Sequence, residues 1–174
     1  MKLFRQRIDA ALPRRQAEQM AVEMIVRLHI GEGFSIAHDG AGAPYIEGYA
    51  PLSVSHCRDE AVIAVSDDDR PIGVDIETER EQLERVRLKF LTEDEVNTFA
   101  SLHDLLRAWT AKEAVYKAAL TPGLALDEIR LELTSCGMRA SARGQVYDVT
   151  YPLDSQGKVI AVAQLSACSS VSEE

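Results

Sequence analysis

The stretch PIGVDIETER, residues 71–80, constrains the fold of this chain more than any other stretch. Apolar residues alternate there with Gly73, Asp75 and Glu77 at a period of two, which predicts a β-strand. Because successive side chains of a strand point to opposite faces, Asp75 and Glu77 share one face. Two neighbouring carboxylates repel each other, so either this face is solvated or a positive group lies between them.

Length, charge and cysteine content exclude several classes of protein. The chain has 174 residues, enough for a core, and its formal net charge of −9 argues against non-specific binding to nucleic acid or membranes. The start, MKLFRQRIDAALPRR, is too charged for a signal peptide, and no run approaches the roughly 20 apolar residues of a membrane span. Cys57, Cys136 and Cys168 lack CxxC spacing, so we expect neither disulfides nor structural zinc. We expect a cytoplasmic protein without a nucleic-acid or membrane partner.

Hydrophobic periodicity in the first part of the chain predicts a helix followed by strands. Residues 14–30 have the spacing of a helix with one buried face, made of Ala17, Met20, Ala21, Met24, Ile25 and Leu28. The stretch LSVSHCRDEAVIAVSDD predicts two strands joined by a polar turn at 57–60.

After Glu77 the same order of helix and strands recurs. Helices are expected in TEREQLERVRLKF, after the capping box of Thr92 and Glu95, and through LLRAWTAKEAVYKAAL until Pro122 and Gly123. Three alternating runs, EIRLEL, GQVYDVTYP and KVIAVAQL, predict strands, and residues 169–174 are expected to form a frayed tail. The fold class is therefore α+β.

The segment AWTAKEAVYKAA, residues 108–119, carries a second group of charges. On a helix, Trp109, Glu113 and either Tyr116 or Lys117 lie on one face, and Glu113 and Lys117 have the spacing of an ion pair. Each residue alone has an ordinary structural interpretation, because such surface pairs stabilise helices by roughly 0.2–0.5 kcal/mol and a lone tryptophan usually belongs to a core.

The combination of the two charged segments indicates a metal site. If they converge, Asp75, Glu77 and Glu113 provide hard oxygen ligands that suit Mg²⁺, with water and phosphate completing the shell. Lys112 and Lys117 beside them suit phosphate oxygens. The residues alone thus indicate Mg²⁺-dependent phosphoryl or pyrophosphate chemistry, and they leave Mn²⁺ open as the metal.

Four motifs, in this order, resemble the 4′-phosphopantetheinyl transferases. They are SVSH at 53–56, GVDIE at 73–77, FLTEDE at 90–95 and WTAKEAVYKA at 109–118. The order and distance of the second and fourth motifs make a specific signature, whereas either alone is weak. The resemblance covers about residues 13–135 and is to the single-chain, surfactin-synthetase-activating (Sfp-like) type rather than to the trimeric acyl-carrier-protein synthases.

The resemblance implies a fold and an activity. It implies one compact unit of two similar α+β halves, residues 1–70 and 71–168, related by a pseudo-two-fold with the active site in the cleft between them. Such an enzyme, a holo-[acyl-carrier-protein] synthase, acts as a monomer. It moves the 4′-phosphopantetheine of coenzyme A onto a serine of an apo acyl or peptidyl carrier protein and releases 3′,5′-ADP.

The resemblance also implies roles for individual residues. Asp75, Glu77 and Glu113 would hold the metal ion, and Glu113 would take the serine proton directly or through a metal-bound water. Lys117 would contact the phosphates with Lys112 in support. Coenzyme A contacts are expected from Ser55, His56, Asp75, Lys112, Lys117 and Arg15.

The carrier protein that the resemblance implies is usually acidic, so an enzyme of net negative charge would need a local basic surface to attract it. Arg85, Arg87 and Lys89 would supply it, although the basic end of a helix is an equally good interpretation of these residues.

Two departures from the family pattern leave an alternative open. The chain reads GAP at 42–44, where the family commonly has Gly-Lys-Pro, so Ala43 removes a cation, and the chain is short ahead of its first helix. The alternative is a coenzyme-A- or carrier-protein-binding module of the same fold with weak or lost transferase activity. A generic Mg²⁺ phosphohydrolase is a third hypothesis for the function. The motifs are compatible with a carrier of fatty acid, polyketide or non-ribosomal peptide synthesis.

Overall fold

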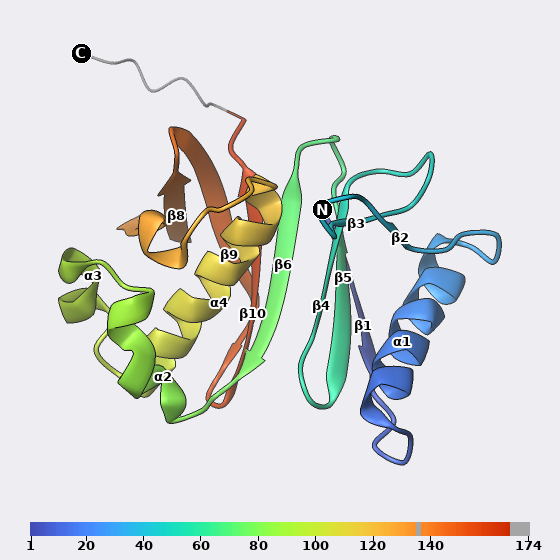
Figure 1. Ribbon diagram of the computed structural model, residues 1–174, viewed down its shortest axis with the longest axis horizontal. Coiled ribbons are helices and arrows are strands. Elements are labelled where there is room, and N and C mark those ends of the chain that lie inside the picture. Colours follow the sequence, from blue (N-terminus) through green and yellow to red (C-terminus); the bar gives the residue numbers. More distant parts are fainter. Residues whose placement is uncertain (135–136, 168–174) are drawn as a thin grey trace.

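Two antiparallel sheets lie side by side in the computed structural model, which describes residues 1–134 and 137–167 (Figure 1). The smaller sheet has the order β1-β5-β4, formed by β1 (Lys2–Arg7), β5 (Glu60–Val65) and β4 (Leu52–His56). The larger has the order β6-β10-β9-β8-β7, formed by β6 (Ile72–Thr78), β10 (Lys158–Leu165), β9 (Gln145–Ser155), β8 (Gly137–Ala142) and β7 (Arg130–Thr134). A short ladder joins β2 (Ala37–His38) and β3 (Pro44–Tyr45). The predicted α+β class is confirmed.

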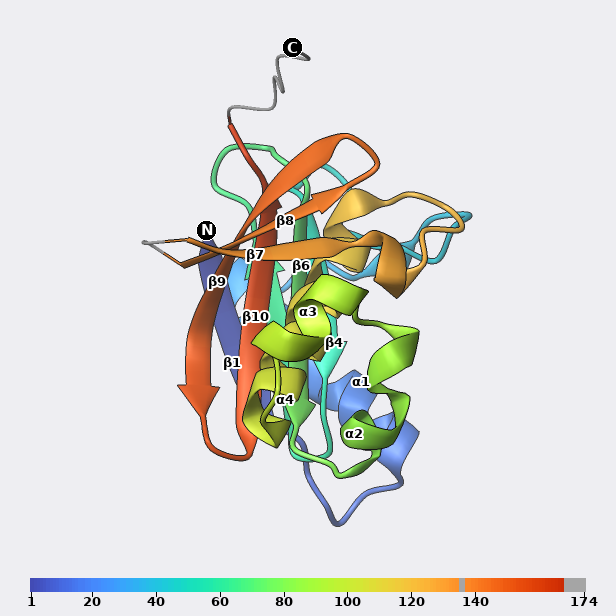
Figure 2. The same ribbon diagram turned by 90° about the vertical axis from the view of Figure 1, so that its left-hand side faces the viewer.

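Helices cover one face of each sheet (Figures 1 and 2). On the smaller sheet lies α1 (Arg14–Ile25), which continues into a π-helical turn, Val26–Ile30. Helix α4 (Leu102–Ala119) lies on β6 and β10. The segments α2 (Gln82–Val86), the 3₁₀ turn Arg87–Lys89 and α3 (Glu93–Thr98) lie on the other side of α4, and a second 3₁₀ turn, Leu126–Glu128, precedes β7. In the described part of the chain, no helix is both long and apolar enough to cross a membrane.

Serine side chains join the two sheets where β4 runs parallel to β6. Ser53 Oγ accepts a hydrogen bond from Val74 N at 3.0 Å, and Ser55 Oγ accepts one from Ile76 N at 3.4 Å. A buried cluster from β5, β6 and β10 fills the face of this junction opposite the helices, with Val62, Ala64, Ile72, Val74, Ile76, Ile160 and Val162 as members. The two sheets therefore share a core.

The predicted buried face of the first helix is wrong in part. Ala17, Ala21 and Ile25 are buried, one turn apart, against the sheet. The other members of the predicted face are exposed, up to 62% for Leu28, and include Met20 and Met24. Because α1 contacts a three-stranded sheet through one row of side chains, half of its apolar stripe faces outward.

Local patterns predicted most of the remaining elements. The strands at 52–56, 60–65 and 72–78 and the capping box of Thr92 and Glu95 are confirmed. The sequence analysis missed β1, an edge strand rich in charge, and β8, a strand of small residues. Cys57 is a buried free thiol, whereas Cys136, Cys168 and the predicted tail at 169–174 lie outside the described residues.

Candidate active site

One face of β6 turns toward α4. Val74 and Ile76 point into the core between the sheets, so the alternation of the strand turns Gly73, Asp75 and Glu77 to the opposite face, under the helix. The predicted shared face of the two carboxylates is confirmed, because Asp75 and Glu77 both contact side chains of α4.

Gly73 sets how closely the helix approaches. A Cβ atom at this position would lie 1.9 Å from the carbonyl oxygen of Ala114 and 2.6 Å from the amide nitrogen of Ala118. Since only glycine lacks a Cβ, α4 rests directly on the backbone of β6 at this point. The helix runs antiparallel to the strand, which sets Lys117 opposite Asp75 and Trp109 opposite Glu77.

Asp75 is the most enclosed acid of the site, 5% exposed. Its Oδ1 accepts hydrogen bonds from Ser55 Oγ and from Lys117 Nζ, each at 2.8 Å. Lys117 Nζ also donates to the carbonyl of Val74 at 3.0 Å. The expected pair of Glu113 and Lys117 is replaced, among the described residues, by this pair with Asp75. Asp75 Oδ2 is buried without a hydrogen-bond partner in the part of the chain that the structure describes.

Glu77 is held by an indole and a guanidinium. Its Oε1 accepts hydrogen bonds from Trp109 Nε1 and from Arg80 Nη2, each at 3.2 Å. The Arg80 guanidinium lies 5.5 Å from the centre of the Trp109 ring, within reach of a cation–π interaction. Trp109 in turn packs edge-on against Phe90, with 5.1 Å between ring centres.

Glu113 completes the group of acids. Burial raises the pKa of Glu113 above its usual value, the negative charge of Asp75 raises it further, and Lys117 opposes both. The pKa of Glu77 is raised by the same two causes, burial and Asp75. A carboxylate with a raised pKa is a stronger base at neutral pH, which suits Glu113 to accept a proton.

The three carboxylates have the chemistry of a divalent-cation site, but Asp75 and Glu77 are held by other partners. Lys117 and Arg80 occupy Asp75 and Glu77, and no three acidic, histidine or cysteine side chains of residues 1–134 and 137–167 stand in a metal-binding arrangement. The donor set is nevertheless all hard oxygen, and Asp75 Oδ2 is a buried acceptor in need of a partner. The chemistry of these donors, rather than their present arrangement, fits a Mg²⁺ or Mn²⁺ ion.

Lys112 does not belong to this site, contrary to the prediction that it binds coenzyme A. Its side chain is 0% exposed, and Nζ donates to Glu95 Oε2 and to the carbonyl of Ile129, each at 2.6 Å. Glu95 Oε1 accepts a hydrogen bond from Leu131 N at 2.6 Å. These contacts turn Lys112 away from the carboxylates of β6. Lys112 thereby ties α4 to α3 and to the start of β7.

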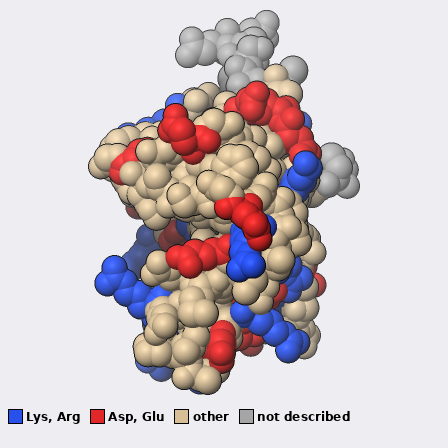
Figure 3. All heavy atoms as spheres, turned by 90° about the vertical axis from the view of Figure 1, so that its right-hand side faces the viewer, with Lys and Arg blue, Asp and Glu red and all other residues tan. Residues whose placement is uncertain are grey.

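The other predicted coenzyme A residues are divided between two places. Ser55 joins the site through Asp75. His56 Nδ1 lies 3.4 Å from Glu18 Oε1 of α1, which also accepts a hydrogen bond from Arg14 at 2.7 Å. Arg15 is exposed on the same helix. On the α1 side of the molecule, basic and acidic side chains are intermingled (Figure 3).

The predicted carrier-protein contacts form an exposed segment. Arg85 lies at the end of α2, and Arg87 and Lys89 lie in the following 3₁₀ turn, with all three side chains exposed. Leu88 between them is 74% exposed. An apolar side chain flanked by cations suits an acidic partner, and the carrier contact remains a prediction.

The sequence analysis missed Arg80. This residue follows the end of β6, where neither strand nor helix periodicity predicts the direction of a side chain. Its proximity to Glu77 depends on the turn between β6 and α2.

The family model described as the 4′-phosphopantetheinyl transferase superfamily matches residues 71–163, more than half of the chain. The protein belongs to this superfamily. The matched segment includes both β6 and α4, and hence Asp75, Glu77, Glu113 and Lys117. Enzymes of this superfamily use coenzyme A to modify carrier proteins and generally require a divalent metal ion. A search of curated proteins gave no match.

Proposed function

We propose that this protein is a Mg²⁺-dependent holo-[acyl-carrier-protein] synthase, which transfers 4′-phosphopantetheine from coenzyme A to a serine of an apo acyl or peptidyl carrier protein. The observation that carries the proposal is the contact between the GVDIE strand and the WTAKEAVYK helix. Lys117 meets Asp75 at 2.8 Å, and Trp109 meets Glu77 at 3.2 Å. This contact sets Asp75 and Glu77 against the helix that carries Lys117 and Glu113, and Glu113 lies within electrostatic reach of both acids.

The proposed reaction breaks the phosphoanhydride bond of the coenzyme A pyrophosphate and forms a phosphoester bond to the carrier serine. The carrier serine oxygen attacks the phosphorus that bears pantetheine, the bond to 3′,5′-ADP breaks, and Glu113 takes the serine proton. Asp75, Glu77 and Glu113 would hold a divalent cation that offsets the negative charge of the pyrophosphate. Lys117, fixed by the carbonyl of Val74, neutralises charge that builds on the leaving phosphate.

Further features of the proposal concern the substrates. Ser55, His56 and Arg15 are proposed to face coenzyme A in a cleft between two halves, residues 1–70 and 71–168, of a monomeric cytoplasmic enzyme of the Sfp-like type. Each half packs a long helix on an antiparallel sheet, α1 in the first half and α4 in the second, which supports a pseudo-two-fold relation. The exposed segment of Arg85, Arg87 and Lys89 is proposed to bind the acidic carrier.

Intact-mass spectrometry of an apo acyl carrier protein tests this function. The carrier is incubated with this protein, coenzyme A and Mg²⁺, and a parallel sample contains EDTA. We expect a gain of one phosphopantetheine mass that EDTA abolishes. If several carriers gain no mass while calorimetry shows binding of coenzyme A, the protein is instead the binding module of the same fold.

A further inference from the structure

The two cationic side chains of the site, Lys117 and Arg80, are held with unequal strength. Lys117 Nζ bonds both the Asp75 carboxylate and the Val74 carbonyl, so the loss of one contact leaves the other. Arg80 has a side chain 42% exposed, and its hydrogen bond to Glu77 is longer, at 3.2 Å, than is usual between charged groups. Solvent screens such an exposed pair, which makes it weak.

The indole beside this pair is fixed more firmly than the guanidinium. Trp109 is half-buried, and its ring is packed edge-on against the fully buried Phe90. Trp109 Nε1 donates to the same Glu77 oxygen as Arg80 does. Arg80 is therefore the partner of Glu77 that leaves most easily, and its departure alters the surroundings of the Trp109 ring.

A divalent cation competes with Arg80 for the same charge. The carboxylates of Asp75, Glu77 and Glu113 lie within Coulombic reach of one another and carry three negative charges when ionised. A compact ion with two charges attracts all three, whereas the guanidinium carries one charge and, among these three acids, is ion-paired with Glu77. Once released, the five N–H donors of Arg80 suit the paired oxygens of a phosphate.

We propose that Arg80 is a displaceable counter-ion of this site, which neutralises Glu77 when no metal is bound and moves to a phosphate of the substrate when a divalent cation takes Glu77. The exchange supplies a phosphate-binding cation in a chain that has Ala43 where a lysine is expected. It rests on the proposed function, because it requires both a divalent cation and a pyrophosphate group.

Calorimetric titrations of wild type and Arg80→Ala with Mg²⁺, and then with inorganic pyrophosphate at saturating Mg²⁺, test the exchange. Removal of the competitor should tighten Mg²⁺ binding by about two- to fivefold, the range of a half-exposed ion pair. The same substitution should weaken pyrophosphate binding by about fivefold or more, since a charged hydrogen-bond donor is lost. A merely structural role of Arg80 would weaken both.

Trp109 provides a second measurement on the unmodified protein. The chain contains a single tryptophan, so its emission reports on this site alone. Mg²⁺ should change the emission of wild type, and the change should be smaller in Arg80→Ala, where no guanidinium lies over the ring. Arg139→Ala is the matched control, because it removes another exposed arginine that is paired with an aspartate, at 3.5 Å, on β8 and β9.

The outcomes separate the inference from the function on which it rests. If Arg80→Ala binds Mg²⁺ with the affinity of Arg139→Ala or more weakly, displacement is refuted while the metal site stands. If its pyrophosphate affinity is unchanged, the movement of Arg80 to phosphate is refuted. Absence of Mg²⁺ binding in all three proteins would contradict the metal-dependent function itself.

Discussion

Gly73 shows how one residue without a side chain positions a whole site. A Cβ atom there would overlap the backbone of α4, at 1.9 Å from the oxygen of Ala114. The carboxylates two and four residues further along β6 reach Lys117 and Trp109 only because the helix lies this close. The strand pattern predicted the shared face of Asp75 and Glu77, but it did not predict how closely α4 approaches. A glycine within a strand only suggests that another backbone comes near.

We expect Gly73→Ala to lower the free energy of unfolding by about 1–3 kcal/mol or more, because backbone must move to accept the methyl group. Urea unfolding followed by circular dichroism measures this change. Gly33→Ala is the control, since nothing lies within 4 Å of a Cβ at that position. Equal stability of the two variants would show that α4 does not press on β6 as described.

Glu113 should destabilise the metal-free fold at neutral pH. Its pKa is raised above the usual 4.5, chiefly by burial and then by Asp75. The folded state therefore favours the protonated Glu113 carboxyl. Its contribution to the free energy of unfolding is fully present below pH 4.5 and is lost as the pH rises through the raised pKa.

Glu113→Gln, which cannot ionise, should accordingly raise the melting temperature in EDTA at pH 7 and have little effect near pH 4. Thermal unfolding at the two pH values checks this prediction. Glu132→Gln, at an exposed position of β7, is the control with the same change of side chain. A stabilisation that is the same at both pH values would mean that ionisation of Glu113 is not its cause.

At the scale of the element, helix α4 explains why the sequence misplaced Lys112. The helix is enclosed by β6 and β10 on one side and by α2 and α3 on the other, so its buried residues surround most of its axis. Helical periodicity in residues 108–119 predicts one buried face, and it therefore places every charged side chain either at the site or in solvent. The direction of Lys112 depends on Glu95, 17 residues earlier, and that contact is not visible in local periodicity.

Lys112→Met should lower the free energy of unfolding by about 3–5 kcal/mol, because it leaves the Glu95 carboxylate buried without a cation. The double variant Glu95→Gln/Lys112→Met should recover much of this loss. Chemical unfolding of the two variants, with Lys89→Met as an exposed control, measures both effects. A cost for Lys112→Met no larger than that of the control would contradict a buried pair.

Other elements were predictable to different degrees for similar reasons. Strands β4, β5 and β6 alternate clearly, since each is buried on a face that the sequence marks with apolar residues. Strand β1 carries charges at Lys2, Arg5 and Arg7, and is defined by pairing with β5, some 60 residues later in the chain. The methionines of α1 were predicted to be buried and are exposed, because an apolar side chain need not lie in the core.

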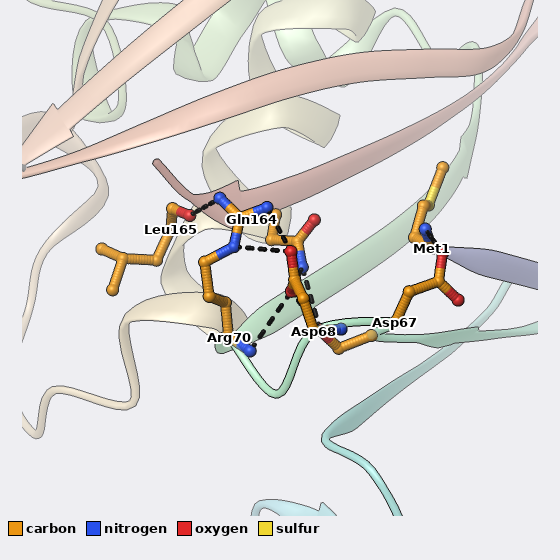
Figure 4. A network of polar contacts seen from close by, with 7 residues as sticks. Met1, Asp67, Asp68, Arg70, Gln164 and Leu165 are labelled. Carbon is orange, nitrogen blue, oxygen red and sulfur yellow. Dashed lines mark hydrogen bonds and ion pairs between the residues drawn. The ribbon is translucent and has the colours of Figure 1, made fainter. Parts of the chain in front are cut away.

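At the scale of the whole molecule, a polar network fastens the loop after β5 to the end of β10 (Figure 4). Arg70 donates to Asp68 and, at 2.7 Å, to the carbonyl of Leu165, while Gln164 Nε2 donates to Asp68 Oδ1 at 2.8 Å. The amino group of Met1 also lies against the neighbouring Asp67. The network links the smaller sheet to the larger one, in addition to the serine contacts between β4 and β6.

This link should weaken in acid. Hydrogen bonds from Arg70 lower the pKa of Asp68 from 3.8 to about 2, so the stability it contributes is present above pH 3.8 and is lost as the pH falls toward 2. Asp68→Asn should therefore be less stable than wild type at pH 5, and the difference should shrink toward pH 2. Urea unfolding across this range checks the prediction.

Asp69→Asn is the control for this series. Asp69 has a φ of 60°, a conformation that asparagine also adopts readily, so the substitution removes a charge from the same loop without strain. If Asp68→Asn and Asp69→Asn depend on pH in the same way, loss of general negative charge rather than of the network explains the effect.

The central claim is that the acids of β6 and α4 carry out phosphopantetheine transfer, and the initial rate of transfer by Glu113→Gln tests it most directly. The rate is followed by intact mass of an apo carrier protein at saturating coenzyme A and Mg²⁺, beside wild type and Glu132→Gln. Loss of a general base predicts a rate about 10²–10⁴-fold below wild type for Glu113→Gln, and an unchanged rate for Glu132→Gln. A Glu113→Gln enzyme as fast as wild type would place the chemistry elsewhere in the molecule.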